Sequence, residues 1–227
     1  MNATDLAIDV SHLVTHYGSR KILDDISFQA RQGEIMVIMG GSGSGKSTLL
    51  RHLLGLHQPT SGSIRLLGKD ITQLSAGEMY DLRKNMGVAF QGGALFNSMT
   101  VGENVELPLR EHTRLDENTM RIMSRMKLEV VNLAGFENLM PSELSGGMIK
   151  RAALARAIVM DPRLLFFDEP SAGLDPVVSA ELDELILILR DAMNMTIVVV
   201  THELESAFKI ADRITVLDQG RILMSDT

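Results

Sequence analysis

A glycine-rich stretch at residues 40–48 constrains the fold of this chain more than any other feature. Its sequence is Gly-Gly-Ser-Gly-Ser-Gly-Lys-Ser-Thr, which fits the phosphate-loop pattern G-x-x-x-x-G-K-[ST]. The apolar run 34–39 before it predicts a buried strand, and the run 48–54 after it predicts a helix. A loop between a strand and a helix is the setting that the pattern requires, so we expect an α/β fold.

The residues of this loop suit the recognition of a phosphate chain. Glycines let the backbone bend sharply and turn its N–H groups toward an anion, and the N-terminus of the following helix adds partial positive charge. The Lys46 ammonium would reach the β- and γ-phosphates, and the Ser47 hydroxyl would bind Mg²⁺. The alternative is a glycine-rich turn with a chance lysine. We expect nine residues to form the site: Gly40, Gly41, Ser42, Gly43, Ser44, Gly45, Lys46, Ser47 and Thr48.

Composition limits the class of protein without defining its function. The 227 residues suit one large domain or a core with an insertion, and 45% apolar residues predict a globular chain. No apolar run approaches the ~18 residues of a transmembrane helix, and residues 1–5 do not resemble a secretory signal, so we expect a cytoplasmic protein. The absence of cysteine excludes disulfides and thiolate metal sites, and a net charge of −7 argues against a nucleic-acid-binding surface.

Two polar residues beside predicted strands are candidates for ligand contact. Residues 5–32 are predicted to form short strands around a turn that contains Tyr17, whose ring could stack on a nucleobase or simply lie on the surface. Gln91 follows the predicted strand 86–90. It would lie at the carboxyl edge of the sheet, where open α/β sheets bind ligands, or it could only end the strand.

Residues 92–160 have a different character, because strand patterns disappear and helical periodicity dominates. The runs 101–110 and 116–133 predict helices, which indicates a helical insertion within an α/β domain. A further helix is predicted over residues 149–160, opened by Leu-Ser-Gly-Gly-Met at 144–148 with Ser145 as a good N-cap. Two glycines at a helix start indicate close backbone approach to a phosphate, or alternatively a flexible hinge.

Acidic and imidazole side chains follow two further predicted strands. The apolar residues 164–167 predict a central strand, and Asp168 and Glu169 come directly after it. If this strand neighbours the strand before the glycine-rich loop, the two acids lie beside the phosphate site. Asp168 would then suit a Mg²⁺ ligand, and Glu169 a general base for an attacking water. A lone histidine is usually structural, but His202 follows the strand 196–200 at the same edge and could donate to a γ-phosphate.

In this order and spacing the motifs resemble the ATP-binding subunit of an ABC transporter. The resemblance rests on Tyr17, the loop 40–48, Gln91, the Leu-Ser-Gly-Gly run at 144–147, the strand and acids at 164–169, the turn 171–175 and His202. It covers nearly the whole chain, and Leu-Ser-Gly-Gly between a phosphate loop and an Asp-Glu strand is highly specific. It implies a P-loop NTPase (RecA-like) fold in a single domain, 1–227. An α/β core with an N-terminal antiparallel β subdomain would span 1–91 and 161–227, and a helical subdomain would span 92–160.

The resemblance also implies roles for individual residues in binding and hydrolysing ATP with Mg²⁺. Tyr17 would stack on adenine, Gln91 would contact Mg²⁺ and the attacking water, and Glu169 would activate that water. The catalytic residues would be Lys46, Gln91, Glu169 and His202, the last holding the γ-phosphate. The Mg²⁺ ligands would be Ser47, Gln91 and Asp168.

A second set of residues would act across a head-to-tail dimer. Ser145, Gly146 and Gly147 would close over the ATP of the partner subunit, with Asp175 helping across the interface. This arrangement is physically reasonable, because a helix N-terminus without a phosphate in its own chain can find one in a partner, and two-fold symmetry repeats the contact. The family usually has glutamine where this chain has Met148. Its loss removes an amide near the partner's ATP, and we expect turnover to survive because the backbone donors and Ser145 remain.

A narrower resemblance is to the ATPase of Mla-type (maintenance of lipid asymmetry) phospholipid transporters of Gram-negative bacteria and their plastid and actinobacterial relatives. It is carried by residues 91–96, residues 108–112 and the run Leu-Ser-Gly-Gly-Met-x-x-Arg. It implies a homodimer at the cytoplasmic face of the inner membrane, with a membrane permease, a membrane-anchored lipid-binding subunit and a small STAS-type regulatory subunit, and no nucleic acid. The chain ends at Thr227, where such ATPases usually continue into another helix, so a C-terminal regulatory contact would be missing.

Other functions remain to be weighed against this one. The chain could serve another ABC importer, or act without a permease in DNA repair, translation or cofactor assembly. Members with those soluble roles usually carry long coiled-coil arms or paired domains, and neither is visible here. A P-loop kinase with a small acceptor would leave the runs 144–147 and 171–175 unexplained.

Overall fold

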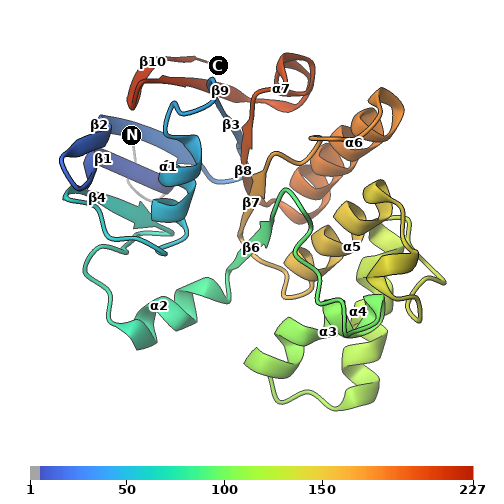
Figure 1. Cartoon of the computed structure of the whole chain (residues 1–227). Helices are drawn as coiled ribbons and strands as arrows, with labels where there is room; N and C mark the ends of the chain where they lie inside the picture. Colours follow the sequence, from blue (N-terminus) through green and yellow to red (C-terminus); the bar gives the residue numbers. More distant parts are fainter. Residues whose placement is uncertain (1–5, 227) are drawn as a thin grey trace.

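A six-stranded sheet runs through the centre of the protein, which we describe from a computed structural model over residues 6–226 (Figure 1). Residues 1–5, considered above for a secretory signal, and Thr227 lie outside the described residues. The strand order is β10-β9-β3-β8-β7-β6. All neighbours are parallel except β10, which is antiparallel to β9. The bounds are β3 Ile35–Met39, β6 Met86–Ala89, β7 Leu164–Asp168, β8 Thr196–Thr201, β9 Arg213–Asp218 and β10 Arg221–Asp226.

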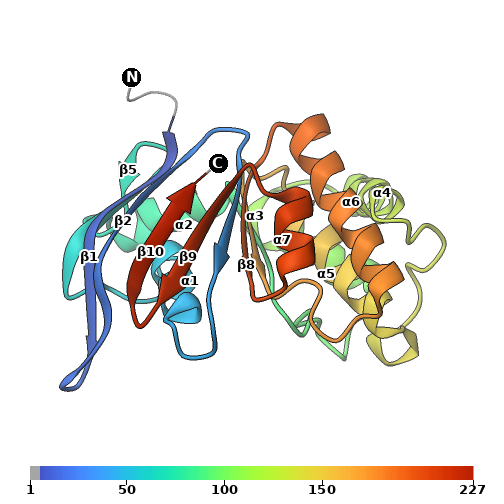
Figure 2. The ribbon, with the colours of Figure 1, turned by 90° about the horizontal axis from the view of Figure 1, so that it is seen from above.

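A smaller antiparallel sheet covers one side of the molecule, with α1 packed between it and the central sheet (Figure 2). Its strand order is β2-β1-β4-β5. The bounds are β1 Leu6–Tyr17, β2 Arg20–Arg31, β4 Ser61–Leu66 and β5 Lys69–Asp70, with α1 at Lys46–Leu53 and α2 at Ala76–Arg83. One apolar cluster joins these elements to the central sheet, including Ile8 of β1, Leu49 and Leu53 of α1, and Ile38 of β3.

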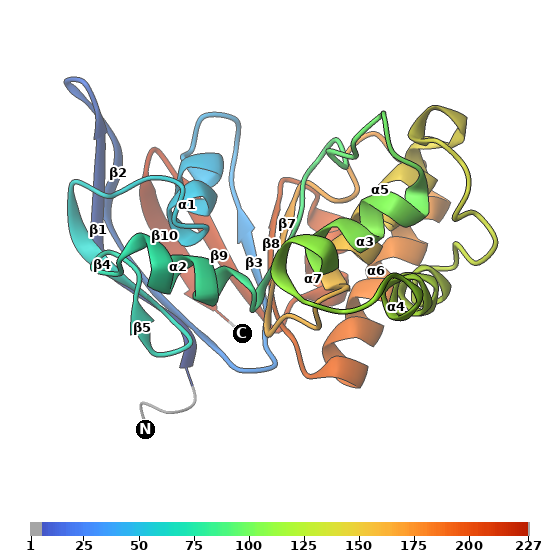
Figure 3. The same ribbon diagram turned by 90° about the horizontal axis from the view of Figure 1, so that it is seen from below.

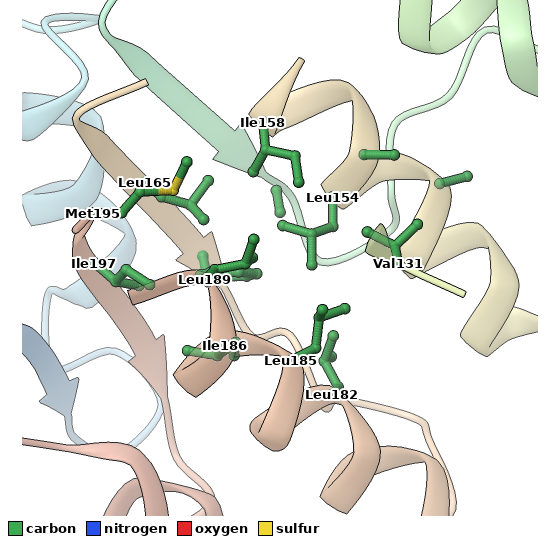
Figure 4. Packing of buried hydrophobic residues seen from close by; sticks show 14 of the residues in the cluster. Val131, Leu154, Ile158, Leu165, Leu182, Leu185, Ile186, Leu189, Met195 and Ile197 are labelled. Atoms are coloured by element: carbon green, nitrogen blue, oxygen red, sulfur yellow. The ribbon is translucent and has the colours of Figure 1, made fainter. Parts of the chain in front are cut away.

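On the opposite side of the central sheet, five helices surround a second apolar cluster (Figures 3 and 4). The bounds are α3 Val101–His112, α4 Glu117–Val130, α5 Gly146–Ile158, α6 Pro176–Met193 and α7 Leu204–Ile210, with a short 3₁₀ turn at Pro141–Glu143. Figure 4 shows Leu154 and Ile158 of α5 facing Leu165 of β7, with Leu189 of α6 beside them. Residues 92–160 contain no strand, and their helices form what we call the helical lobe.

Alternation along the central strands explains why both faces are apolar. In β3, Met36 and Ile38 join the cluster beneath the smaller sheet, whereas Ile35 and Val37 join the cluster beneath the helices. Successive side chains of a strand point to opposite faces, so a strand covered on both faces needs a continuous apolar run. The predicted runs 34–39 and 164–167 are such strands, and an α/β fold results.

The structure differs from the sequence-based expectations at the N-terminal strands. Short strands were expected around a turn containing Tyr17, but β1 and β2 have 12 residues each, and Tyr17 is the last residue of β1. A bulge explains why the alternation was hard to follow. His12 has a left-handed φ of 50°, and the pairing register shifts between Val10 and Leu13. The buried face therefore passes from even-numbered to odd-numbered residues along one strand.

The strand that carries the two acids does not neighbour the strand before the glycine-rich loop. The expected placement of the two acids beside the phosphate site depends on these two strands being neighbours in the sheet, but β8 lies between β3 and β7. The consequence for the site is small, because β3, β8 and β7 are parallel and their carboxyl ends meet at one edge of the sheet. Asp168 and the start of the segment after β8 are thereby placed on the edge from which the glycine-rich loop departs.

Candidate functional site

The glycine-rich loop leaves β3 after Met39 and enters α1 at Lys46. Gly43 and Gly45 have left-handed φ angles of 78° and 109°, which residues with side chains rarely adopt. Gly40 is required for another reason, because a Cβ there would lie 2.2 Å from the carbonyl oxygen of Leu217. The three glycines are therefore needed for the course of the loop itself, whatever ligand it binds.

The loop is supported by a hairpin turn from the far end of the chain. The backbone N–H of Gly220, in the turn between β9 and β10, donates to the Ser44 carbonyl at 2.9 Å. The N–H of Asp24 in β2 donates in turn to the Gly220 carbonyl at 2.8 Å. Leu217, which limits the space at Gly40, belongs to the same hairpin. Three segments distant in sequence thus fix the shape of the loop.

The N-terminus of α1 fits an anionic group. Gly45 is its N-cap, no side chain caps it, and its first turn holds no acidic residue. The Lys46 ammonium lies inside the loop, 9% exposed by residue, and donates to the carbonyls of Gly40 at 2.6 Å and Gly41 at 3.2 Å. The buried Ser44 hydroxyl has no hydrogen-bond partner among the described residues. Backbone donors, an ammonium and an unpaired hydroxyl are the groups that a phosphate would satisfy.

Glu169 and His202 form a pair at the carboxyl edge of the sheet. The Glu169 carboxylate Oε2 lies 2.8 Å from His202 Nδ1 and 3.3 Å from the His202 backbone N. Glu169 has a left-handed φ of 50°, unusual for a residue with a side chain, and its N–H donates to the Val200 carbonyl at 2.8 Å. Since Nδ1 is engaged by the carboxylate, Nε2 is the ring nitrogen left to donate to a phosphate oxygen.

Asp168 ends β7 beside this pair. Burial raises the pKa of its carboxyl above the usual range, as does the nearby charge of Glu169, while Arg51 and Lys46 act in the opposite direction. Residues 6–226 contain no group of three or more His, Cys, Asp or Glu suited to a metal. The expected Mg²⁺ ligands are of another kind, namely one carboxylate, the Ser47 hydroxyl and the Gln91 amide oxygen. Such a hard-oxygen set fits Mg²⁺, which is commonly held by one or two carboxylates together with substrate phosphates.

Tyr17 and Gln91 are both exposed at the rim of the site. The Tyr17 side chain is presented at the end of β1, with the residue 44% exposed and its ring edge-on to His57 at 6.3 Å. Gln91 stands two residues beyond the end of β6. The Arg156 guanidinium donates to the carbonyls of Gly93 and Ala94 at 2.8 and 2.7 Å, which anchors the segment after Gln91 to α5.

Helix α5 begins three residues earlier than predicted. Gly146 and Gly147 are its first residues rather than a lead-in to a start at residue 149, because the Ser145 hydroxyl accepts the N–H of Met148 at 3.3 Å and starts the helix there. Gly147 packs against Val178 of α6, where a Cβ would meet the Val178 side chain at 2.8 Å. The helix ends at Ile158, two residues before the predicted end.

The N-termini of α1 and α5 lie in different lobes, as Figures 1 and 3 both show. Residues 145–147 are therefore not part of the phosphate loop of their own chain. Asp175 is the N-cap of α6, and its carboxylate accepts the N–H groups of Val177 and Val178 at 3.0 and 3.1 Å. Ser145 and Asp175 are both exposed.

Sequence reasoning missed two residues that hold the site together. His52 of α1 is fully buried, and its ring bonds the Thr15 hydroxyl at 2.8 Å and the His57 carbonyl at 2.9 Å. It ties α1 to the strand that presents Tyr17. The second is Lys150 of α5, which bonds carbonyls beside Glu169. No local pattern distinguishes either residue from an ordinary helix position, because Thr15 is distant in sequence from His52, and residues 169–172 are distant from Lys150.

Comparison with known proteins identifies the family. The profile of the ABC transporter family matches residues 23–172. The chain belongs to the ABC transporter family. The sequence-based prediction of an ABC-type ATPase is thereby confirmed, and so is the narrower likeness to Mla-type ATPases.

Two relatives align with almost the whole length of this ABC ATPase. It is 46% identical over 220 residues to the intermembrane phospholipid transport system ATP-binding protein MlaF of Haemophilus influenzae, covering 97% of this chain and 83% of the relative. It is 43% identical over 219 residues to the probable ribonucleotide transport ATP-binding protein mkl of Mycobacterium leprae, covering 96% of this chain and 63% of the relative.

Solved structures confirm the predicted fold. The ABC ATPase superposes on a dimeric post-hydrolysis state of the ATP-binding cassette MJ0796, bound to ADP and Pi, with a TM-score of 0.89 and 30% identity. The alignment covers 97% of this chain and 98% of that one. The fold is therefore the P-loop NTPase fold of ABC cassettes. The roles of individual site residues stay predictions.

Proposed function

We propose that this ABC ATPase powers phospholipid transport across a Gram-negative envelope, from the cytoplasmic face of the inner membrane. Its 46% identity to an intermembrane phospholipid transport ATPase, over nearly the full chain, supports the cargo. No helix within residues 6–226 has the length and apolarity to span a bilayer. In this proposal, which rests on the likeness to that relative, the chain acts as a peripheral subunit attached to a membrane permease, with a lipid-binding subunit and a STAS-type subunit as further partners.

The separation of the two helix N-termini carries the mechanical part of the proposal. The phosphate loop at α1 lies in one lobe, and the capped N-terminus of α5 lies in the other. In a head-to-tail dimer, Ser145, Gly146 and Gly147 of each chain close over the ATP held by the partner's loop. Two-fold symmetry then gives two equivalent sites, each built from both chains. Asp175 would help at the same interface.

Hydrolysis in this site relies on positioning and electrostatic stabilisation. Tyr17 stacks on adenine, and Lys46 and the loop N–H groups hold the phosphates. Glu169 accepts the proton of the attacking water, and His202 donates to the γ-phosphate. Mg²⁺ would be held by Ser47, Gln91 and Asp168, where it neutralises phosphate charge.

A groove beside the segment after Gln91 supports coupling to a permease. It has a volume of about 400 Å³ and lies between α2, β6, α3 and α5, with Phe90 and Phe96 exposed at 41% and 51%. Ala94 and Phe96 line this groove, whereas Leu95 between them packs against the core beneath the helices. An apolar helix end of the permease could insert into this groove. Closure of the nucleotide site around Gln91 would then move the groove and the inserted helix with it.

The test is recovery of the permease from membranes. The tagged ATPase, extracted with mild detergent from the bacterium that encodes it, should co-purify with an integral membrane permease identified by mass spectrometry. Phe96→Glu should lose the permease. Phe208→Glu should keep it, because Phe208 is 73% exposed on α7, outside the groove. Recovery of soluble partners alone would contradict the proposal.

The cargo is tested separately, since the ATPase does not touch it. The purified complex, reconstituted in vesicles, should move a fluorescent phospholipid only with ATP and not with the Glu169→Gln subunit. The mycobacterial relative is named for ribonucleotide transport, so a labelled ribonucleotide is the matched competitor. ATP-dependent movement of the ribonucleotide without movement of phospholipid would show that phospholipid is not the cargo. The assignment as an ATPase would still hold.

A further inference from the structure

Lys150 is a helix residue whose ammonium binds the backbone of another segment. It lies one turn into α5, and its Nζ donates to the carbonyls of Pro170 at 2.5 Å, Ala172 at 2.7 Å and Glu169 at 3.4 Å. An ammonium has three donors, and here all three are directed at consecutive parts of one short segment. Bonds from a charged donor are among the stronger hydrogen bonds in proteins.

The segment that Lys150 holds is the one that carries the proposed base. Glu169 has the left-handed φ of 50° described above, a conformation that persists only where surrounding contacts impose it. One such contact is the bond from its N–H to the Val200 carbonyl. The three bonds from Lys150 lie on the other side of the residue, on its own carbonyl and on the residues that follow.

The surroundings of Lys150 favour a fixed position rather than a solvated one. Its side chain borders a small apolar cavity with Phe90, Phe167 and Leu182, and the residue is half-buried. Burial lowers the pKa of the ammonium, while the charges of Glu203 and Glu169 act in the opposite direction. A lysine held in this way loses side-chain freedom, which the three carbonyl bonds must offset.

We propose that Lys150 is a positioning residue that ties the helix capping the partner's ATP to the segment carrying this chain's own base. The proposal rests on the proposed function of Glu169 and of the α5 N-terminus. Since residue 150 follows Ser145–Gly147 within two turns of a rigid helix, movement of α5 toward the partner's nucleotide is transmitted through Lys150 to Glu169. Each chain would thereby set its own base only when it also caps the other site.

The test compares Lys150→Met with Lys127→Met. Methionine keeps most of the stem volume and removes the ammonium. Lys127 is the matched control, because it is a largely buried lysine of the helical lobe that bonds Asp161 at 2.5 Å, away from the base. We expect Lys150→Met to lower kcat at least about tenfold, since small displacements of a catalytic group have effects of this size. The ATP Kd of the isolated subunit should stay the same, and Lys127→Met should keep kcat.

Two further measurements separate positioning from folding. Lys150→Arg should restore most of kcat, because a guanidinium can donate to several carbonyls, and the Hill coefficient for ATP should fall toward one in Lys150→Met. Thermal unfolding of both methionine variants shows whether each is folded at the assay temperature. If Lys150→Met does not fold, the comparison of wild type with Lys150→Arg and Lys150→Gln carries the test, with arginine expected to be active and glutamine slow.

The inference is wrong if Lys150→Met keeps kcat and the Hill coefficient of the wild type, or if Lys127→Met loses kcat equally. It is also wrong if Lys150→Met weakens ATP binding and leaves kcat unchanged. If Glu169 is not the base that the proposed function requires, a different experiment shows it: the Glu169→Gln variant would hydrolyse ATP at steady state. The two results can therefore be told apart.

Discussion

The helices α1 and α5 begin in opposite ways, although glycines precede or form the start of both. Before α1, Gly43 and Gly45 have left-handed backbone, the neighbouring lysine is buried, and the hairpin of β9 and β10 supports the loop. At α5 the glycines are the first helical residues, Ser145 caps the helix, and Ser145 and Gly146 are exposed. The loop before α1 encloses its binding site from several sides, whereas the start of α5 is an exposed surface.

In the proposed dimer, this difference would give one chain two unequal parts of a site. A cradle that is shaped by distant segments can bind a phosphate by itself. An exposed helix N-terminus has N–H donors and partial positive charge, but no surrounding segments enclose a ligand there. It can therefore contact a phosphate only when another molecule holds that phosphate against it. Variants that alter one of the two helix starts and leave the other unchanged test this difference.

The largest effect is expected for Glu169→Gln, which should leave both helix ends intact. Because a general base contributes about 10²- to 10⁴-fold to a rate, kcat should fall by that factor. ATP binding and ATP-driven dimerisation should survive. Phosphate release and light scattering measure the two properties. Substantial hydrolysis would remove Glu169 from its role.

Lys46→Ala should weaken ATP binding by the loop before α1 and leave the start of α5 unchanged. Loss of hydrogen bonds from a charged donor costs about 1.5–3 kcal/mol, so the ATP Kd should rise about 10- to 100-fold. Calorimetry on the isolated subunit provides the value. The control is Lys209→Ala, which removes an exposed lysine paired with Glu184 on the far helices. Equal ATP affinity in Lys46→Ala and wild type would argue against the loop assignment.

A matched pair of alanines contrasts the two ends directly. Gly40→Ala should destabilise the fold by about 1–3 kcal/mol and lose ATP binding, because its Cβ would press on the Leu217 carbonyl. Gly146→Ala meets no atom within 4 Å and should stabilise α5 by up to about 1 kcal/mol. It should nevertheless hydrolyse ATP slowly, since in the proposed dimer the added methyl group would lie against the partner's phosphates.

Thermal unfolding, ATP binding and hydrolysis are measured for both alanine variants. Loss of ATP binding by isolated Gly146→Ala would place residue 146 in its own chain's site. That outcome would remove the distinction between the two ends.

The smallest effect on the isolated subunit is expected for Ser145→Ala. Loss of an N-cap costs about 1 kcal/mol, which lowers Tm by roughly 2–4 °C in a chain of this size. Dimerisation of the Glu169→Gln subunit with ATP should weaken as well. Because the chain has no cysteine, the pair Ser42→Cys and Ser145→Cys reports directly on the interface. With ATP, the cysteine at position 42 of one protomer should cross-link to the cysteine at position 145 of the other, and failure of this cross-link to form with ATP would contradict the head-to-tail arrangement.

The sequence was sufficient for the elements whose signals are local. The strand at β3 and the loop 40–48 follow from a continuous apolar run and a spaced glycine pattern, and the acids at 168–169 follow from a second apolar run. Ser145 was correctly placed as a cap. The start of α5 was still misplaced by three residues, because glycine propensity argued against a helix that the serine cap and the packing of Gly147 on Val178 favour.

Other features depend on contacts that no local pattern contains. The bulge at His12 reverses the burial phase of β1, and only pairing with β2 and β4 reveals it. The insertion of β8 between β3 and β7 is a property of sheet order, which the spacing of motifs does not specify. Lys150 contacts Pro170 and His52 contacts Thr15, both far along the chain, so the sequence around each residue gave no sign of its role.

The hydrogen bond from Gly220 to Ser44 has a consequence for synthesis of the chain. The glycine-rich loop is translated well before residues 217–220, which support it. A nascent chain on the ribosome would expose residues 40–48 long before that hairpin emerges. The loop should therefore reach its final shape, and bind ATP, only after residues 217–220 have emerged and folded against it.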